Sequence, residues 1–194
     1  MLTPFLLGLS NDINAITINA SLLGASLSLP QWHWTPKSGL WSIARCLDHL
    51  NRTGYAMLPG IHRAIENLKF TRRLGSDSFP YNLVERLFVS AMGPNSRIKL
   101  PVPPMFEPAV APNTDIIVPQ FLALQGELSE CLKSARGFDL SAVTIASPVN
   151  EKLRFRLGPF LEAIVRHEQY HYEQVEKVRT HPQFPMGQVR SSSD

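Results

Sequence analysis

The chain has 194 residues, of which 44% are hydrophobic and 18% charged, and this length is typical of one domain. The net charge is only +3 and the basic residues are spread along the chain, which argues against a nucleic-acid-binding protein. The two cysteines, Cys46 and Cys131, are too few for the disulfide framework of a small secreted domain, so a cytoplasmic protein is expected.

The apolar residues near the N-terminus do not form a signal peptide. No Lys or Arg precedes the run between Phe5 and Leu9, and Ser10 ends it at once. No stretch of the chain approaches the roughly 18 apolar residues that are needed to span a bilayer. We therefore expect a soluble, unprocessed protein that does not enter a membrane.

The first half of the chain has the apolar spacing of helices. Apolar residues three and four apart predict a first helix over about residues 2–27, followed by a compact connection over residues 29–40 that holds two prolines. Ser42 is suited to cap a second helix. This helix is predicted over about residues 43–68, with a kink at Pro59-Gly60.

The second half predicts further helices separated by a proline-rich connection. A short helix is expected over about residues 81–91. Six prolines between residues 101 and 119 exclude a long helix or a central strand there, and residues 93–119 are predicted to form an extended crossover. A third main helix is expected over about residues 117–137 and a fourth over about residues 159–181, before a polar tail. No pair of strands is predicted.

The chemistry is concentrated in the segment His167-Glu168-Gln169-Tyr170-His171. Two histidines four residues apart lie about 40° apart on one helix face and roughly 6 Å along its axis, so they can share a cation. Such a pair is more often solvated than metal-bound, and a third ligand is needed. The segment also matches the H-E-x-x-H motif of metalloproteases, but Gln174 and Lys177 stand where the metzincin extension requires Gly and His.

A third histidine, His49, belongs to a series of short motifs that extends from about Trp32 to Val178. These motifs are Trp34-Thr35-Pro36, Trp41-Ser42-Ile43, His49-Leu50, Asp139-Leu140, Ser147-Pro148 and the pair His167 and His171 followed by Gln174. In their order and spacing the chain resembles the DinB/YfiT-like family of bacterial metal-binding helical bundles.

The resemblance implies an all-α fold and a ligand set. The fold is a four-helix bundle with a long crossover between the second and third main helices, where the proline-rich residues 93–119 lie. His49, His167 and His171 correspond to the three metal ligands of the family. We expect one such domain over residues 1–182 and a flexible C-terminal tail over residues 183–194.

Three neutral histidines leave one or more coordination positions open, as in catalytic metal sites. Imidazole ligands suit Zn, Ni, Fe or Mn, so the sequence leaves the metal open. Ligand histidines usually donate their second ring N–H to a carboxylate or carbonyl, and Asp48, Glu168 and Gln174 are candidates for this role or are ordinary solvated side chains.

Other candidate residues have simpler explanations. Cys46 precedes His49 by one turn and could approach the metal, but a buried Cys more often packs as a small hydrophobe. A tryptophan cluster at a helix connection is more often a core plug than a substrate pocket. The tryptophans concerned are Trp32, Trp34 and Trp41, and the histidines expected not to bind metal are His33, His62 and His181.

The family resemblance implies a thiol-dependent transferase or isomerase with a small-molecule substrate. A metal-bound low-molecular-weight thiol would lose its proton and attack an electrophile as the thiolate. Glu168 is the candidate proton acceptor. The alternatives are metal-assisted hydrolysis by a bound hydroxide and a non-catalytic metal-binding or stress-response bundle, which could form a homodimer through exposed helix faces.

Overall fold

The computed structural model describes residues 3–75, 79–96 and 101–186, and helices dominate them, as predicted. The helices are α1 (Pro4–Ser26), α2 (Leu29–His33), α3 (Ile43–Thr71), α4 (Leu83–Met92), the short 3-10 helix η1 (Pro104–Phe106), α5 (Thr114–Ser134) and α6 (Leu157–Arg179). Two strands, β1 (Thr144–Ser147) and β2 (Asn150–Arg156), lie between α5 and α6.

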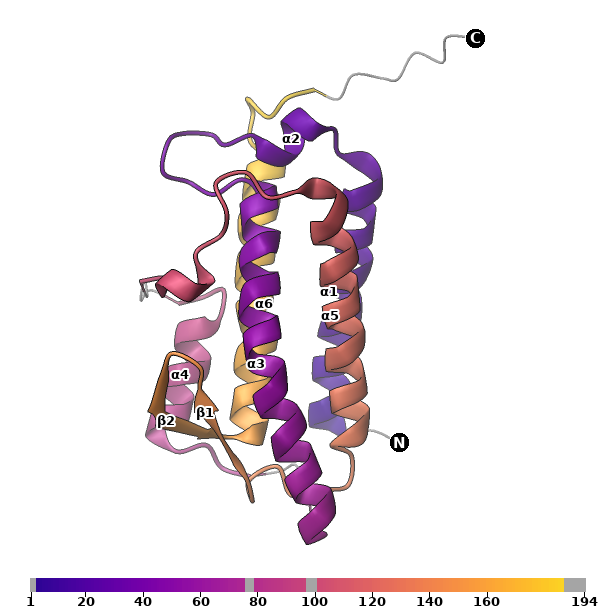
Figure 1. Ribbon diagram of the computed structural model, residues 1–194, viewed down its shortest axis with the longest axis vertical. Helices are drawn as coiled ribbons and strands as arrows, with labels where there is room; N and C mark the ends of the chain where they lie inside the picture. The colour runs from indigo at the N-terminus through magenta and orange to yellow at the C-terminus, as the bar shows by residue number, and fades with distance from the viewer. Residues whose placement is uncertain (1–2, 76–78, 97–100, 187–194) are drawn as a thin grey trace.

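Four long helices, α1, α3, α5 and α6, run along the long axis of the molecule (Figure 1). Both α1 and α3 pack against α5 and α6. The apolar residues that recur at intervals of three and four face one another between these helices and form the core. Its largest fully buried side chains include Ile13, Leu50, Ile61, Phe121 and Phe160.

Helix α3 begins where the sequence predicts. The side chain of Ser42 accepts a hydrogen bond from the backbone N–H of Arg45 (3.3 Å) and caps the first turn. The helix continues through Pro59, and Figure 1 shows a change of direction near its middle. It ends at Thr71, and the next residue, Arg72, has a left-handed conformation (φ 49°).

The expectation that no strands pair is wrong. Strands β1 and β2 form an antiparallel hairpin in which Thr144 pairs with Arg156 and Ile145 with Phe155. The residues Ser147-Pro148, expected in a plain loop, lie at its turn. Only Ile145 and Phe155 are buried in the two strands, so the alternation of apolar and polar residues is too short to predict a hairpin.

The prediction that no long helix runs through residues 93–119 is also wrong at its end, because α5 begins at Thr114 and contains Pro119. The side chain of Asn113 accepts a hydrogen bond from the backbone N–H of Asp115 (2.9 Å) and caps this helix. Of the predicted crossover, residues 97–100 lie outside the described residues.

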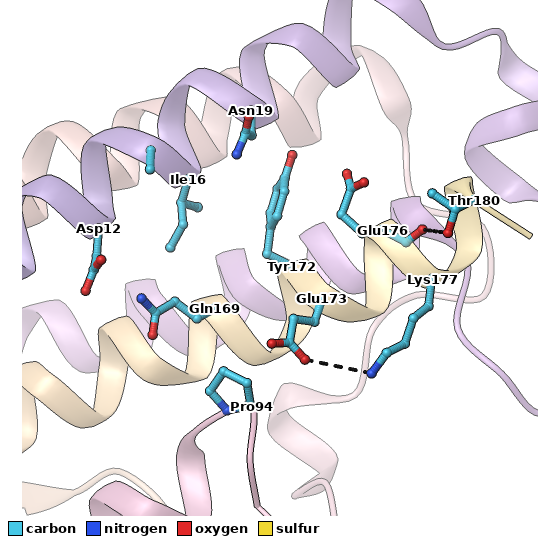
Figure 2. A pocket seen from close by; sticks show the side chains of 11 residues that line it. Asp12, Ile16, Asn19, Pro94, Gln169, Tyr172, Glu173, Glu176, Lys177 and Thr180 are labelled. Carbon is cyan, nitrogen blue, oxygen red and sulfur yellow. Dashed lines mark hydrogen bonds and ion pairs between the residues drawn. The ribbon is translucent and has the colours of Figure 1, made fainter.

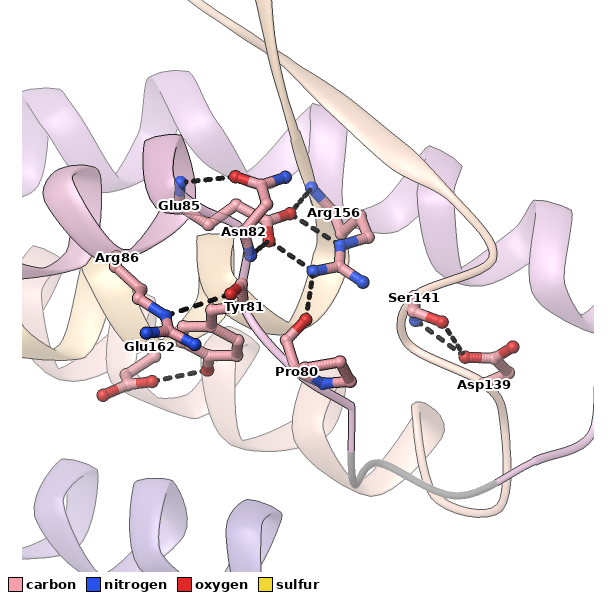
Figure 3. Close-up of polar contacts among 9 residues, drawn as sticks. All are labelled: Pro80, Tyr81, Asn82, Glu85, Arg86, Asp139, Ser141, Arg156 and Glu162. Carbon is pink, nitrogen blue, oxygen red and sulfur yellow. Dashed lines mark hydrogen bonds and ion pairs between the residues drawn. The ribbon is translucent and has the colours of Figure 1, made fainter.

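A buried ion pair fixes the start of α6. Arg156, the residue that precedes this helix, binds the carboxylate of Glu85 on α4 through Nε (2.7 Å) and Nη2, and Nη2 also donates to the Pro80 carbonyl (2.7 Å) (Figure 3). The Glu85 side chain is only 3% exposed, and the hydrogen bonds from Arg156 lower its pKa. Because α6 carries His167 and His171, this ion pair helps to hold the helix that presents them.

Part of the predicted C-terminal tail is described. Phe184 packs edge-on against Trp34, with ring centroids 5.5 Å apart, and Gln31 Nε2 donates to the Pro185 carbonyl (2.9 Å). Residues 187–194 lie outside the described residues. In the part of the chain that the structure describes, no helix has both the length and the apolar character needed to cross a membrane.

Candidate metal centre

The three predicted histidines meet between α3 and α6. His49 lies on α3, and His167 and His171 lie one turn apart on α6. The Nε2 atom of His167 is 3.2 Å from that of His49 and 3.1 Å from that of His171. Among the described residues, this is the group of His, Cys, Asp or Glu side chains placed to share one metal ion.

The backbone of the proline-rich segment orients His49. Its Nδ1 atom lies 2.8 Å from the carbonyl oxygen of Phe106 in η1. A carbonyl only accepts hydrogen bonds, so Nδ1 carries the proton and Nε2 keeps its lone pair. The sequence could not identify this partner, because a backbone carbonyl has no residue-type signature.

Gln174 orients His171 in the same way, as one of the sequence-based candidates suggested. Its Oε1 atom lies 3.0 Å from Nδ1 of His171 and also accepts a weak hydrogen bond from Cys46 Sγ (3.9 Å). Two donors therefore face the same oxygen, which is consistent with Nδ1 of His171 being protonated and its Nε2 being free to bind a cation.

The donor set fits a divalent cation. With the usual metal–nitrogen distance, tetrahedral geometry places two imidazole nitrogens about 3.3–3.4 Å apart, close to the separations between His167 and its two neighbours. Without a cation, His167 Nε2 has at most one proton to donate, yet it faces unprotonated nitrogens on both His49 and His171. A shared metal ion would satisfy all three lone pairs.

Burial keeps these imidazoles neutral. It is the largest influence on all three, and it lowers the pKa of His49, lowers the pKa of His171 to about 3 and lowers the pKa of His167 well below 6.5. Neutral imidazole is the form that binds metals, so the site needs no proton release before a cation enters.

Trp41 forms one wall of the site. Its ring stacks on that of His171 with centroids 5.6 Å apart and contacts the ring of His49 at 4.9 Å. The expected role of a core plug fits Trp32, which is 4% exposed, better than Trp41, which is only partly buried beside the histidines. The packing of Trp41 against two imidazoles was not predicted.

The remaining candidate residues lie elsewhere. Within the described ranges, Asp48 accepts hydrogen bonds from Arg52 and from the backbone N–H of Ala109 and makes none with a histidine. His62 contacts Cys131 and Glu127, and His181 packs on Trp34, while His33 is the last residue of α2. Cys46 is fully buried, and burial raises the pKa of its thiol to about 12.

Glu168 points toward α5. Its Oε1 atom accepts a hydrogen bond from Gln125 Nε2 (2.9 Å), and its Oε2 atom is buried with no hydrogen-bond partner among the described residues. Burial, which outweighs the hydrogen bond from Gln125, raises the pKa of Glu168 to about 7. A carboxyl with this pKa can exchange a proton at neutral pH.

An open groove of about 600 Å³ lies on another face of α6, between this helix and α1 (Figure 2). At about 100° per residue, Gln169 and Glu176 in this groove lie on the side of α6 opposite to His167 and His171. None of the three histidines lines the groove. The groove is therefore separate from the candidate metal centre.

Comparison with known families identifies a match that covers the site. The family model of the DinB superfamily matches residues 20–175, which is more than half of the chain and contains all three histidines. No match was found among curated proteins or solved structures.

Proposed function

The chain belongs to the DinB superfamily, and we propose that it is a metal-dependent enzyme in which His49, His167 and His171 hold one divalent cation. The observation that carries the proposal is the meeting of three Nε2 atoms, two of them kept unprotonated by hydrogen bonds from the opposite ring nitrogens. Nitrogen ligands of this kind suit Zn, Ni, Fe or Mn.

We propose further that the protein is a transferase or isomerase that uses a low-molecular-weight thiol and acts on a small electrophilic substrate. A divalent cation with three protein ligands would keep an open position at which a bound thiol loses its proton. The thiols of the chain itself are unsuited to this role, because burial raises the pKa of Cys46 to about 12 and that of Cys131 to about 11. The reacting thiol must therefore be supplied from solution.

Thiol-dependent turnover is the direct test. Zinc-loaded protein is expected to conjugate 1-chloro-2,4-dinitrobenzene to at least one member of a panel of low-molecular-weight thiols, measured by absorbance of the product. His49→Ala and chelated protein should show only the uncatalysed rate. If fully loaded protein gives no turnover with any thiol but hydrolyses model esters, the site is a hydrolase, and if it does neither, the non-catalytic binding function is favoured.

Glu168 is proposed as the proton acceptor for the thiol, because a buried carboxyl with a pKa near 7 can take up a proton at working pH. Glu168→Gln should then keep the metal and lose most turnover. The folded state holds a proton on Glu168 up to about pH 7 and the unfolded state only to about 4.5, so this group costs stability as pH rises through that interval. The variant should therefore melt at a higher temperature than wild type at pH 8.

Glu173→Gln is the matched control for Glu168→Gln, because Glu173 lies on the same helix, is exposed and pairs only with Lys177 among the described residues. It should leave metal content, turnover and melting temperature unchanged. Loss of metal from Glu168→Gln in proportion to its loss of turnover would make Glu168 a supporting residue. Unchanged turnover would exclude it as the proton acceptor.

The remaining assignments follow from the family and the packing of the helices. We propose that α1, α3, α5 and α6 are the helices of a four-helix bundle, that residues 93–113 are its crossover, and that residues 1–182 form one domain before a tail of residues 183–194. Free thiols at Cys46 and Cys131 suit the cytoplasm. A homodimer is proposed as well, and light scattering tests it.

A further inference from the structure

Arg45 lies at the edge of the candidate metal centre. It precedes His49 by four residues on α3, so both side chains leave the same face of the helix. The Arg45 guanidinium carbon is 5.7 Å from the centre of the Trp41 ring, the ring that stacks on His171. The Trp41 ring therefore contacts both the Arg45 guanidinium and the histidine cluster.

The hydrogen bonds of the Arg45 guanidinium are incomplete. Nη2 donates to Glu107 Oε1 (3.0 Å), but Nε is buried and has no partner among the described residues. Buried donors are nearly always paired in folded proteins, so an unpaired Nε needs an explanation. Nε and Nη of a guanidinium form a fork that matches the two oxygens of a carboxylate, and Glu107 uses only one side of it.

Glu107 comes from the same segment that orients His49. It follows Phe106, whose carbonyl accepts the hydrogen bond from His49 Nδ1. Burial is the largest influence on the pKa of His49 and lowers it, but the charge of Glu107 acts in the opposite direction, as expected for a carboxylate near the site. The Glu107 side chain is 51% exposed and can turn into solvent.

We propose that Arg45 binds a carboxylate of the substrate, and that Glu107 occupies this position until the substrate replaces it. The substrate carboxylate would accept hydrogen bonds from both Nε and Nη2 of Arg45, whereas Glu107 accepts only one. The site therefore takes a carboxylate-bearing small molecule, with its reacting end directed past Trp41 to the three histidines. The placement of the reacting end at the three histidines rests on the proposed function, whereas the binding of a carboxylate by Arg45 does not.

Propionate and its neutral isostere propionamide test the inference. Binding is followed through the indole N–H signal of Trp41 in nitrogen-15 NMR spectra, on zinc-loaded and on metal-free protein. Wild type should bind propionate at least about tenfold more tightly than propionamide. Arg45→Met should abolish this preference, Arg45→Lys should retain a part of it because it keeps the charge without the fork, and Glu107→Gln should tighten propionate binding severalfold.

Arg52→Met is the matched control. Arg52 lies on the same helix, carries the same charge and pairs with Asp48 (2.9 Å), so its loss should leave the preference intact. The inference is overturned if Arg45→Met keeps the preference, if Glu107→Gln fails to tighten propionate, or if inorganic phosphate binds wild type more tightly than propionate does. Failure of wild type to take up zinc would contradict the proposed function, and the titration of metal-free protein would still decide the role of Arg45.

Discussion

His49→Ala is expected to lower the affinity of the protein for zinc by at least about 100-fold, since loss of a mere hydrogen-bond partner of a ligand already costs 10–100-fold. His49 is 118 positions from His167, so only the folded chain brings these two nitrogens together. Zinc at about 100 times its dissociation constant should stabilise wild type by about 2.7 kcal/mol. This corresponds to a rise in melting temperature of roughly 5–10 °C, measurable by calorimetry.

The matched control is His62→Ala, on the same helix but paired with Glu127 (3.4 Å) outside the cluster. It should bind zinc like wild type, and chelation should lower the melting temperature of wild type and of this control but not that of His49→Ala. Equal zinc affinity of His49→Ala and wild type would contradict the three-histidine site.

The response of the site to acid follows from the same burial. Because burial lowers the pKa of all three histidines, protons should compete with zinc only below the ordinary imidazole value of 6.5. In metal-free protein, as pH falls, the histidines of the unfolded chain bind protons near pH 6.5, whereas those of the folded chain bind protons only at lower pH. Its stability should therefore fall as pH decreases from 6.5 toward the lowered pKa values.

Glu85→Ala is expected to cost about 3–5 kcal/mol of unfolding free energy, measured by urea denaturation. Glu85 is 3% exposed and holds the guanidinium of Arg156, the residue that precedes α6, through both carboxylate oxygens. Its removal leaves this cation without its carboxylate partner between α4 and the hairpin. Zinc affinity should fall as well, because the start of the helix that carries His167 and His171 loses its anchor.

Glu66→Ala is the control for this change. Glu66 is 70% exposed and pairs with Lys69 on the surface of α3, where an ion pair contributes about 0–1 kcal/mol. If Glu85→Ala costs no more than Glu66→Ala, the Arg156 ion pair does not stabilise this end of the molecule.

The helices and the meeting of the three histidines could be predicted from the sequence for different reasons. The helices follow from apolar residues at intervals of three and four, which the core of the fold uses directly. The spacing of His167 and His171 predicts a shared face, but only the resemblance to a family adds His49, because no local pattern connects residues so distant in the chain.

The features that the sequence did not predict depend on tertiary contacts or on backbone atoms. The hairpin between α5 and α6 has too few buried residues for a clear alternation, and α5 tolerates Pro119 in its second turn. The partners of the site are a carbonyl at Phe106 and a guanidinium at Arg45 whose Nε is unpaired among the described residues. Both depend on the packing of η1 and the residue after it against α3, which brings together positions far apart in the chain.

The carbonyl of Phe106 makes the protonation of the His49 ring independent of any one side chain. Every amino acid supplies a main-chain oxygen, so substitutions along residues 101–113 can accumulate without changing which nitrogen of His49 is available to a cation, provided that the main chain keeps its path. The position of the main chain at Phe106 therefore matters more in this segment than the identity of its side chains. Inserting or deleting one residue next to Phe106 is expected to move this oxygen away from His49 Nδ1, so indels should be more damaging there than point substitutions.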